Sequence, residues 1–250
     1  MSTDTPVGCP DHCAIVGAGR VGNALTGALR AAGIAVDGPL GRGDALPATV
    51  PVLLCVPDAQ IAVAARTIPP GGLVGHTSGA TTLDALAGHE AFSLHPLMTV
   101  PLGAGPAQLA GAPAAVAGST PRALRTAHAL ARAARMEPFE IADADRAAYH
   151  AAASIAANLL VTLEDGAERL LATAGAERAM LVPLVRAAVE AWASEGGERA
   201  LTGPIARGDR ETVDRQRAAV AERTPDMLEA FEALARATER LAARRTEIAA

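Results

Sequence analysis

The glycine turn near the amino terminus constrains the fold of this chain more than any other feature of the sequence. Gly17, Gly19 and Gly22 stand in G-x-G-x-x-G spacing directly after the apolar run "CAIV", and a segment with helical apolar spacing follows them. In this context the first glycine permits a tight turn, the second lets the backbone approach a pyrophosphate, and the third lets the helix pack closely on the strand. The string therefore predicts a strand, a phosphate-binding turn and a helix.

Short apolar runs alternate with helical patterns in the first half of the chain. The runs favour strands because they are bounded by turn residues; they occupy residues 13–16, 34–40, 50–57, 73–80, 91–96, 112–118 and 137–141. Alternation of this kind favours a parallel sheet with helices on both faces. After about residue 142 only helical patterns follow, over residues 143–173, 176–195, 209–222 and 225–245. We therefore predict an α/β protein with an N-terminal Rossmann-type parallel sheet in residues 1–142 and a C-terminal all-helical domain in residues 143–250.

Composition and charge exclude several classes of function. The chain has 250 residues and a formal net charge of −5, and it contains only three Phe, one Tyr and one Trp. Because it has neither a basic block nor a set of stacking aromatics, we expect no nucleic-acid partner. No apolar run is long enough to span a membrane and the amino terminus lacks the features of a secretory signal, so we expect a cytoplasmic protein. Cys9, His12 and Cys13 have no fourth ligand nearby, so we expect no metal site.

The second predicted strand bears on the choice of dinucleotide. An NAD site usually has an acidic residue at the end of this strand, where it binds the ribose hydroxyls. Asp37 lies at about the right distance from the glycines but falls in the middle of the strand, and Arg42 follows the strand end. An arginine there can bind a 2′-phosphate through two parallel hydrogen bonds. The sequence favours NADP over NAD; the alternative is that Arg42 is a solvated surface residue and Asp37 serves NAD.

Further cofactor contacts are expected at the carboxyl ends of the strands, where ligands of open α/β sheets bind. Besides the three glycines and Arg42, the candidate residues are Ala18, Arg20, Val21, Val56, Pro57, Thr77 and Ser78. His95 lies at the end of the next strand and is a candidate proton donor. For each of these polar residues taken singly, capping of a loop is an equally good interpretation.

The alanine-rich segment "YHAAASIAANLLVTL" contains polar residues at four-residue spacing. His150, Ser154 and Asn158 would lie on one face of a helix. A histidine titrates near neutral pH and can donate a proton, and an asparagine amide can donate a hydrogen bond to a developing oxyanion. We predict His150 as proton donor or substrate clamp, with His95 as the competing donor, and Ser154 and Asn158 as contacts to substrate or carboxamide. The alternative is that all three make hydrogen bonds between helices.

Arg207 stands in the string "LTGPIARGD", where Gly203 and Pro204 predict a turn between helices. Its guanidinium could bind a substrate carboxylate through two hydrogen bonds. Two other roles remain open, which are capping of a helix and pairing with Asp209.

The strings "GAGRVG", "CVPDA", "HTSGA", "LHPLMT", "YHAAASIAANLLVTL" and "LTGPIARGD", in this order, resemble a group of bacterial Rossmann-type NADP oxidoreductases. Members of the group carry a carboxyl-terminal helical domain of unknown function, and the group belongs with 6-phosphogluconate dehydrogenase-like and pyrroline-5-carboxylate reductase-like enzymes. The resemblance implies an NADP-binding domain followed by a helical domain for substrate binding and dimerisation. In that superfamily the first long helix of the second domain often carries a catalytic lysine, whereas this chain has no lysine and has His150 on the corresponding segment.

The resemblance also implies an activity. We expect an NADPH-dependent oxidoreductase that transfers hydride to a small carbonyl substrate, and some members of the group resemble alternative ketopantoate reductases, which suggests a 2-oxo acid. Two alternatives remain, an imine reductase of the pyrroline-5-carboxylate reductase type and a non-catalytic NADPH-sensing regulatory protein. A homodimer is expected because the helical domains of this superfamily often dimerise.

Overall fold

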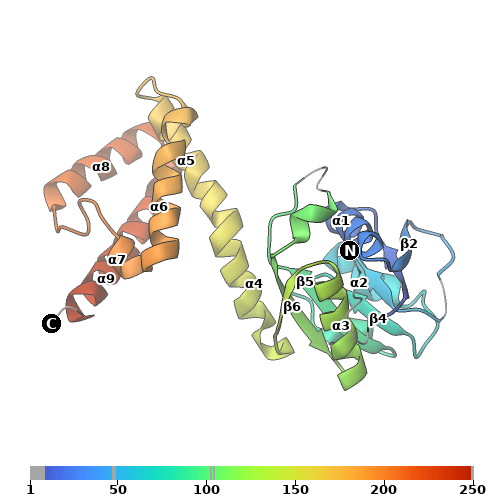
Figure 1. Ribbon diagram of the computed structural model, residues 1–250. Coiled ribbons are helices and arrows are strands. Elements are labelled where there is room, and N and C mark those ends of the chain that lie inside the picture. Colours follow the sequence, from blue (N-terminus) through green and yellow to red (C-terminus); the bar gives the residue numbers. More distant parts are fainter. Residues whose placement is uncertain (1–8, 47–48, 102, 104, 249–250) are drawn as a thin grey trace. The chain divides into compact units, whose positions relative to one another are not determined.

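The computed structural model describes residues 9–46, 49–101, 103 and 105–248. The chain divides into two compact units, residues 1–157 and residues 158–250, and each is described by itself (Figure 1). Residues 1–8, on which the expectation about a secretory signal partly rests, lie outside the described residues.

Seven strands form the sheet of the first unit, and each occurs where the sequence predicts a strand. They are β1 (His12–Val16), β2 (Ala35–Leu40), β3 (Val52–Leu54), β4 (Leu73–His76), β5 (Glu90–Pro96), β6 (Pro113–Gly118) and β7 (Glu137–Glu140). Their order across the sheet is β2-β1-β3-β4-β5-β6-β7. β1 to β5 run parallel, which confirms the predicted α/β fold class with a Rossmann-type sheet.

The last two strands correct one part of the prediction. β6 pairs antiparallel with β5, and β7 runs parallel to β6, so the sheet is not parallel throughout. Parallel neighbours need a crossover connection, usually a helix. The described part of the connection between β5 and β6 contains only the short 3₁₀ helix η2 (Pro106–Leu109). The chain therefore returns beside β5 in the opposite direction.

β5 extends beyond its parallel neighbour. Glu90 to Ser93 pair with β4, whereas the last three residues of the strand pair only with β6. His95 lies in this extension, opposite Ala115. The antiparallel strand therefore holds the part of β5 that carries His95.

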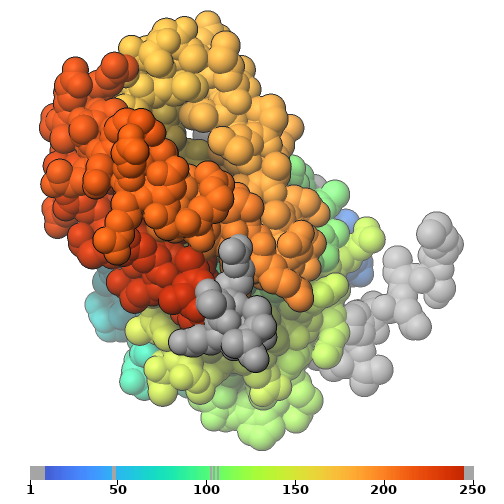
Figure 2. All heavy atoms as spheres, turned by 90° about the vertical axis from the view of Figure 1, so that its left-hand side faces the viewer, coloured from blue at the N-terminus to red at the C-terminus, as the bar shows by residue number. Residues whose placement is uncertain are grey.

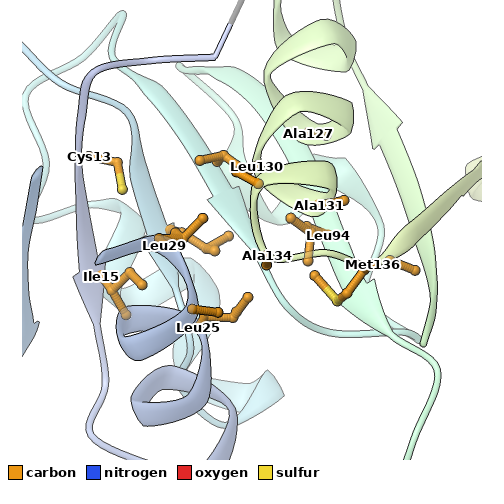
Figure 3. Close-up of a cluster of buried hydrophobic side chains, with 14 of the residues drawn as sticks. Cys13, Ile15, Leu25, Leu29, Leu94, Ala127, Leu130, Ala131, Ala134 and Met136 are labelled. Carbon is orange, nitrogen blue, oxygen red and sulfur yellow. The ribbon is translucent and has the colours of Figure 1, made fainter. Parts of the chain in front are cut away.

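Helices cover both faces of the sheet. α1 (Arg20–Ala31) and α3 (Pro121–Ala133) lie on one face, and α2 (Asp58–Ala65) with the 3₁₀ helix η1 (Leu83–Leu86) lies on the other. The sequence predicts a short α-helix at residues 81–88, and the structure forms η1 there instead. The buried cluster under α1 and α3 includes Cys13, Ile15, Leu25, Leu29, Leu94, Leu130 and Met136 (Figure 3).

α4 (Arg146–Ser154) follows the 3₁₀ turn η3 (Asp143–Asp145) and is fixed to the sheet by its first residue. The Arg146 side chain is 1% exposed; its Nε donates to Asp143, and its Nη2 donates to Ser93 Oγ at 2.5 Å. The sequence places the domain boundary at residue 142, where the strands end, whereas the compact units divide between Ala157 and Asn158. The boundaries differ because Arg146 ties the start of the helical segment to β5.

The polar helix face expected from the sequence is interrupted. After Ser154 the chain forms η4 (Ile155–Leu159), a π-helical turn, and continues as α5 (Leu160–Ala172). A π-helix closes its hydrogen bonds over five residues instead of four. The α-helical spacing from which the polar face is predicted therefore ends at Ser154, and the placement of Asn158 on that face stays a prediction.

The second unit is all helical. After α5 it contains η5 (Arg178–Met180), α6 (Val182–Glu195), α7 (Gly197–Ala200), α8 (Arg210–Arg223), η6 (Pro225–Met227) and α9 (Leu228–Ile248). Large apolar side chains on its surface are exposed, among them Val161 (68%), Leu184 (66%) and Trp192 (62%); Figure 2 shows the helices of this unit in yellow to red. Among the described residues, no helix is both long and apolar enough to cross a membrane.

Candidate functional site

The glycine turn between β1 and α1 has the shape that a diphosphate requires. A Cβ on Gly17, whose φ is +108°, would lie 2.3 Å from the Cys55 carbonyl oxygen, and a Cβ on Gly22 would lie 2.0 Å from the Gly17 oxygen. Gly19 differs from both, because nothing lies within 4 Å of the position of its Cβ. The first and third glycines therefore allow close packing of the protein on itself, while the second faces open space.

The amino terminus of α1 leaves its N–H groups free. Gly19 is the N-cap residue and provides no side-chain cap, and the first turn has no acidic residue. Ala18, Gly19 and Arg20 are exposed. The Asn23 amide donates to the carbonyls of Ala18 (2.7 Å) and Gly19 (3.0 Å), so it holds the turn from the side opposite the N–H groups. Free N–H groups and the helix dipole attract an anion here, and the residues present fit the diphosphate of a dinucleotide.

The loop after β2 bears on the choice of dinucleotide. Asp37 is the third residue of β2, and its carboxylate binds the Nε2 of His12, the first residue of β1, at 2.9 Å. The Asp37 carboxylate is therefore paired with a residue at the amino-terminal end of β1, and it does not lie at the carboxyl edge of the sheet. Arg42 is exposed after the strand end and forms no ion pair within the described part of the chain. The Gly41 N–H donates to Asp44 at 2.7 Å, which closes the turn that carries Arg42.

The loops after β3 and β4 border the glycine turn. Val56 Cγ1 lies 3.3 Å from the position of a Cβ on Gly17, Val21 is half-buried and packs against the core, and Pro57 is the exposed N-cap residue of α2. The Thr77 N–H donates to the Leu54 carbonyl at 3.1 Å, which joins the ends of β3 and β4. Thr77 is half-buried, so a ligand at this edge can reach it.

The Ser78 side chain holds its loop together through several hydrogen bonds. Its hydroxyl donates to Asp58 Oδ2 at 2.8 Å and accepts from the N–H groups of Ala80 (3.2 Å) and Thr81 (3.0 Å). The Thr81 hydroxyl lies 2.9 Å away. Since the side chain is buried and already has these partners, the geometry favours the loop-capping interpretation over a cofactor contact.

His76 is a buried group that the sequence does not single out. Its Nδ1 accepts from the Ser78 N–H at 3.2 Å, and its Nε2 has no hydrogen-bond partner in the described part of the chain. Burial, and after it the nearby Arg146, lower the pKa of His76 to about 4. The imidazole is therefore neutral at neutral pH.

We predict that His76 makes the stability of the protein depend on pH. Its folded pKa of about 4 lies below the ordinary 6.5, so between these values the unfolded chain binds a proton that the folded chain does not. The contribution of His76 is complete above about pH 6.5 and is lost as the pH falls to about 4, by roughly 3 kcal/mol in all. Urea unfolding across this range measures the loss. His76→Asn, which keeps an acceptor for the Ser78 N–H, should reduce the slope; an unchanged slope contradicts the assignment.

His95 and Tyr149 form a hydrogen-bonded pair at the carboxyl edge of the parallel strands. His95 Nδ1 and the Tyr149 hydroxyl oxygen lie 2.6 Å apart, and the two rings meet edge to face with centroids 5.6 Å apart. The imidazole packs over Gly79, where a Cβ would lie 2.9 to 3.0 Å from three ring atoms. The ring of His150 is also close, with its centroid 6.4 Å from that of His95. The structure thus brings together His95 and His150, the two candidate proton donors, and adds Tyr149.

Both members of the pair are neutral at neutral pH. Burial, and after it the nearby His150, lower the pKa of His95 to about 4. Burial raises the pKa of Tyr149 to about 12, and Arg146 opposes this shift. The pair therefore carries no net charge before it donates a proton.

The remaining predicted residues are not part of this pair. Ser154 is the half-buried last residue of α4, and the exposed Asn158 lies in η4 and belongs to the second unit. Arg207 is exposed in the loop before α8. Asp209 caps α8 by accepting from the Thr212 N–H at 3.1 Å, so the capping role left open for Arg207 belongs to Asp209.

Solved structures of similar fold cover nearly the whole chain. A protein from Bacteroides fragilis, named provisionally as an NADP oxidoreductase, has a TM-score of 0.77 at 16% identity, over 92% of this chain and 98% of that one. The protein TM1727 from Thermotoga maritima has a TM-score of 0.74 at 20% identity, over 94% and 99%. A reductive aminase from Aspergillus terreus, solved with NADPH and ethyl levulinate, has a TM-score of 0.63 at 16% identity, over 94% and 98%. These similarities establish the fold.

Sequence comparison identifies the family. No curated protein matches the chain at a significant level. The family model described as a domain of unknown function, DUF2520, matches residues 112–238, which run from the strand region into α9. This match confirms the resemblance to Rossmann-type proteins with a carboxyl-terminal domain of unknown function. The chain therefore belongs to the DUF2520 family.

Proposed function

We propose that the protein is an NADP(H)-dependent oxidoreductase that reduces a small carbonyl compound. The observation that carries the proposal is the combination of two features at one edge of the sheet. These are an open glycine turn at the start of α1 and a neutral pair of proton-bearing side chains, His95 and Tyr149. The name of the Bacteroides protein and the NADPH in the Aspergillus structure support the choice of cofactor.

Separate parts of the chain bind the cofactor and supply the proton. The turn from Gly17 to Gly22 binds the diphosphate through the N–H groups of α1, and Thr77 borders the cofactor from the next loop. The bound nicotinamide supplies a hydride. The pair at the end of β5 supplies the proton that the reduced substrate needs.

The 2′-phosphate is the part of the cofactor that we assign to Arg42. Arg42→Ala should weaken NADPH binding by about 10- to 100-fold, the effect of losing hydrogen bonds to a charged group, and should leave NADH binding unchanged. Calorimetric titration with both dinucleotides measures the difference. Arg66→Ala, at the exposed end of α2, is the matched control. An equal loss for NADPH and NADH would mean that Arg42 does not read the phosphate.

A substrate screen tests the activity. The loss of NADPH absorbance is followed with 2-oxo acids including ketopantoate, neutral ketones, aldehydes and cyclic imines. We expect NADPH to bind more tightly than NADH and at least one carbonyl compound to be reduced. Turnover of imines alone would favour the imine reductase alternative, which the similarity to a reductive aminase supports. Tight binding without any turnover would favour the sensing protein, and no heat of binding would contradict all three.

Contacts to the substrate are assigned to the helical segments. Arg207 forms no ion pair within the described residues, and we assign to it the carboxylate of a 2-oxo acid. Arg207→Gln should then raise KM for the 2-oxo acid and leave KM for a neutral ketone unchanged. Ser154 and Asn158 keep their predicted role as contacts to substrate or carboxamide, so alanine at either position should slow turnover without weakening NADPH binding.

The surface of the second unit supports the proposal of a homodimer. Val161, Met180, Leu184 and Trp192 are each more than 60% exposed, and exposed apolar side chains in such number are typical of an interface. We therefore expect a dimer by light scattering after size-exclusion chromatography. Trp192→Glu should produce a monomer, and Glu229→Gln on α9 is the control. A wild-type monomer at micromolar concentration contradicts the proposal.

A further inference from the structure

We infer that Tyr149 donates the proton that completes the reduction, and that His95 positions Tyr149 by donating its Nδ1–H to the phenol oxygen. The inference rests on the proposed function, because a proton is required only if a carbonyl oxygen receives an electron pair. Tyr149 is then the catalytic residue, and His95 acts through it.

The surroundings of the two rings assign these roles. The imidazole is held in place by Gly79 on one face and by the antiparallel strand β6 behind its backbone. Both side chains are half-buried, so a ligand can reach the pair; Tyr149 stands on α4 and has the ring of Phe139 at 6.1 Å as its other aromatic neighbour. Because the imidazole is packed over Gly79 and stands on paired strand backbone, it is the member of the pair that is fixed, and we assign the contact with the substrate to the phenol.

The hydrogen bond between the rings contains one hydrogen, and its position decides which group can donate. If the phenol donates to Nδ1, its proton is engaged and cannot reach a substrate. If Nδ1 carries the hydrogen, the phenol accepts it and keeps its own O–H free. Among the described residues, the one hydrogen bond found for the His95 ring is that of Nδ1 with Tyr149, so Nε2 can remain unprotonated in this second arrangement.

The acid strengths favour the phenol as the donor. With a pKa of about 4, His95 is almost entirely unprotonated at neutral pH, so it holds no acidic imidazolium proton. The Tyr149 phenol, with a pKa of about 12, keeps its proton at neutral pH and is still a stronger acid than the alcohol formed. A proton therefore moves downhill from the phenol to the alkoxide.

One of the ionisable groups near the pair, Arg146, favours this transfer. Arg146 and His150 of α4 and Asp58 at the start of α2 act on His95, and Arg146 acts on Tyr149. Arg146 lowers the pKa of Tyr149, so its positive charge stabilises the phenolate that the transfer leaves. The Nδ1–H of His95 stabilises the same oxygen through a hydrogen bond.

The step balances without a further reactant. As hydride from the reduced dinucleotide reaches the carbonyl carbon, the π pair of the carbonyl moves to its oxygen. The phenol O–H bond breaks, and a new O–H bond forms on that oxygen. The phenolate of Tyr149 then takes a proton from water at the exposed side of its ring, which restores the pair.

Nuclear magnetic resonance of the full chain tests the arrangement without using activity. With isotope-labelled histidine nitrogens, we expect His95 to carry its hydrogen on Nδ1 and to leave Nε2 unprotonated, both with and without NADP⁺. His95→Asn identifies the signals. A hydrogen on Nε2, with Nδ1 as acceptor, would overturn the inference whatever the substrate is.

Kinetics test the roles. Tyr149→Phe should lower kcat by about 10²- to 10⁴-fold, the range for a general acid, and leave the Kd for NADPH unchanged. His95→Asn, whose amide can donate to the phenol, should keep at least about tenfold more activity than His95→Ala. His128→Asn on α3, which removes the pairing with Glu140 at 3.0 Å, should match the wild type.

The pH profile separates the phenol from an imidazolium donor. With Tyr149 as the acid, kcat should stay level between about pH 6 and pH 8, whereas an imidazolium donor would make kcat fall as the pH rises through this range. A fully active Tyr149→Phe, or equal activity of the two His95 variants, overturns the inference. A wild-type protein that binds NADPH and reduces no carbonyl counts instead against the proposed function.

Discussion

Gly19→Ala should leave the protein as stable as the wild type but weaken NADPH binding by at least about tenfold, which corresponds to about 1.4 kcal/mol. The φ of Gly19 is −73°, an angle that alanine adopts without strain, and a Cβ would meet no protein atom within 4 Å. The methyl group would instead enter the space in which the N–H groups of the turn face a diphosphate. Calorimetric titration measures the affinity, and urea unfolding measures the stability.

Gly22→Ala is the matched substitution, and its main effect should be on the stability of the protein. Its Cβ would lie 2.0 Å from the Gly17 oxygen, which is backbone and cannot move aside. We expect a loss of about 3 kcal/mol or more in the free energy of unfolding, at the upper end for an overpacked site. Unfolding without dinucleotide isolates this loss from binding. If Gly22→Ala were as stable as the wild type, or Gly19→Ala bound NADPH normally, the turn would not work as described.

Arg146→Met should lower the free energy of unfolding by about 3 kcal/mol, near the lower end for a broken buried ion pair. The Arg146 side chain is 1% exposed and binds both Asp143 and Ser93, so its removal leaves the Ser93 hydroxyl without this partner and the Asp143 carboxylate without its counter-charge. The loss is not larger because Asp143 is 34% exposed and can regain water. Urea unfolding measures the effect. The pKa of His76 should also rise, since Arg146 helps to lower it.

Two variants control for the loss of charge. Arg122→Met removes a pair with Glu90 in which the arginine is 67% exposed, and it should change stability by at most about 1 kcal/mol. Asp143→Asn combined with Arg146→Met removes the unpaired carboxylate, and its amide oxygen can still accept from the Leu83 N–H. This double variant should be more stable than Arg146→Met alone. Equal effects of Arg122→Met and Arg146→Met would show that burial of the arginine is unimportant.

The strands and long helices could be predicted because their signals are local. Each strand is an apolar run bounded by glycine, proline or a polar turn, and the G-x-G-x-x-G string fixes the position of α1. The direction of β6 could not be predicted in the same way. A run such as "PAAVAG" has the same pattern in parallel and antiparallel pairing, and direction depends on the connection before it.

The candidate site was predictable only in part, because spacing along the chain does not report contacts across it. The four-residue spacing singles out His150 and the place at a strand end singles out His95, and these two rings lie close together in the structure. The sequence does not single out Tyr149, although it directly precedes His150 and is the only tyrosine of the chain, because its partner His95 lies 54 residues away. For Ser78 the sequence leaves a cofactor contact and loop capping equally open, since it does not reveal that the hydroxyl has the Asp58 carboxylate as a partner.

The extension of β5 past β4 separates two tasks within one sheet. The loops to which we assign the dinucleotide follow β1, β2, β3 and β4, whereas His95 stands on residues that only β6 pairs with. Changes to the loops can therefore alter which coenzyme is accepted without moving the imidazole. For the same reason, the end of β5 that carries His95 can change while the loops assigned to the coenzyme stay the same. Each of these two parts can therefore be redesigned while the other is left intact.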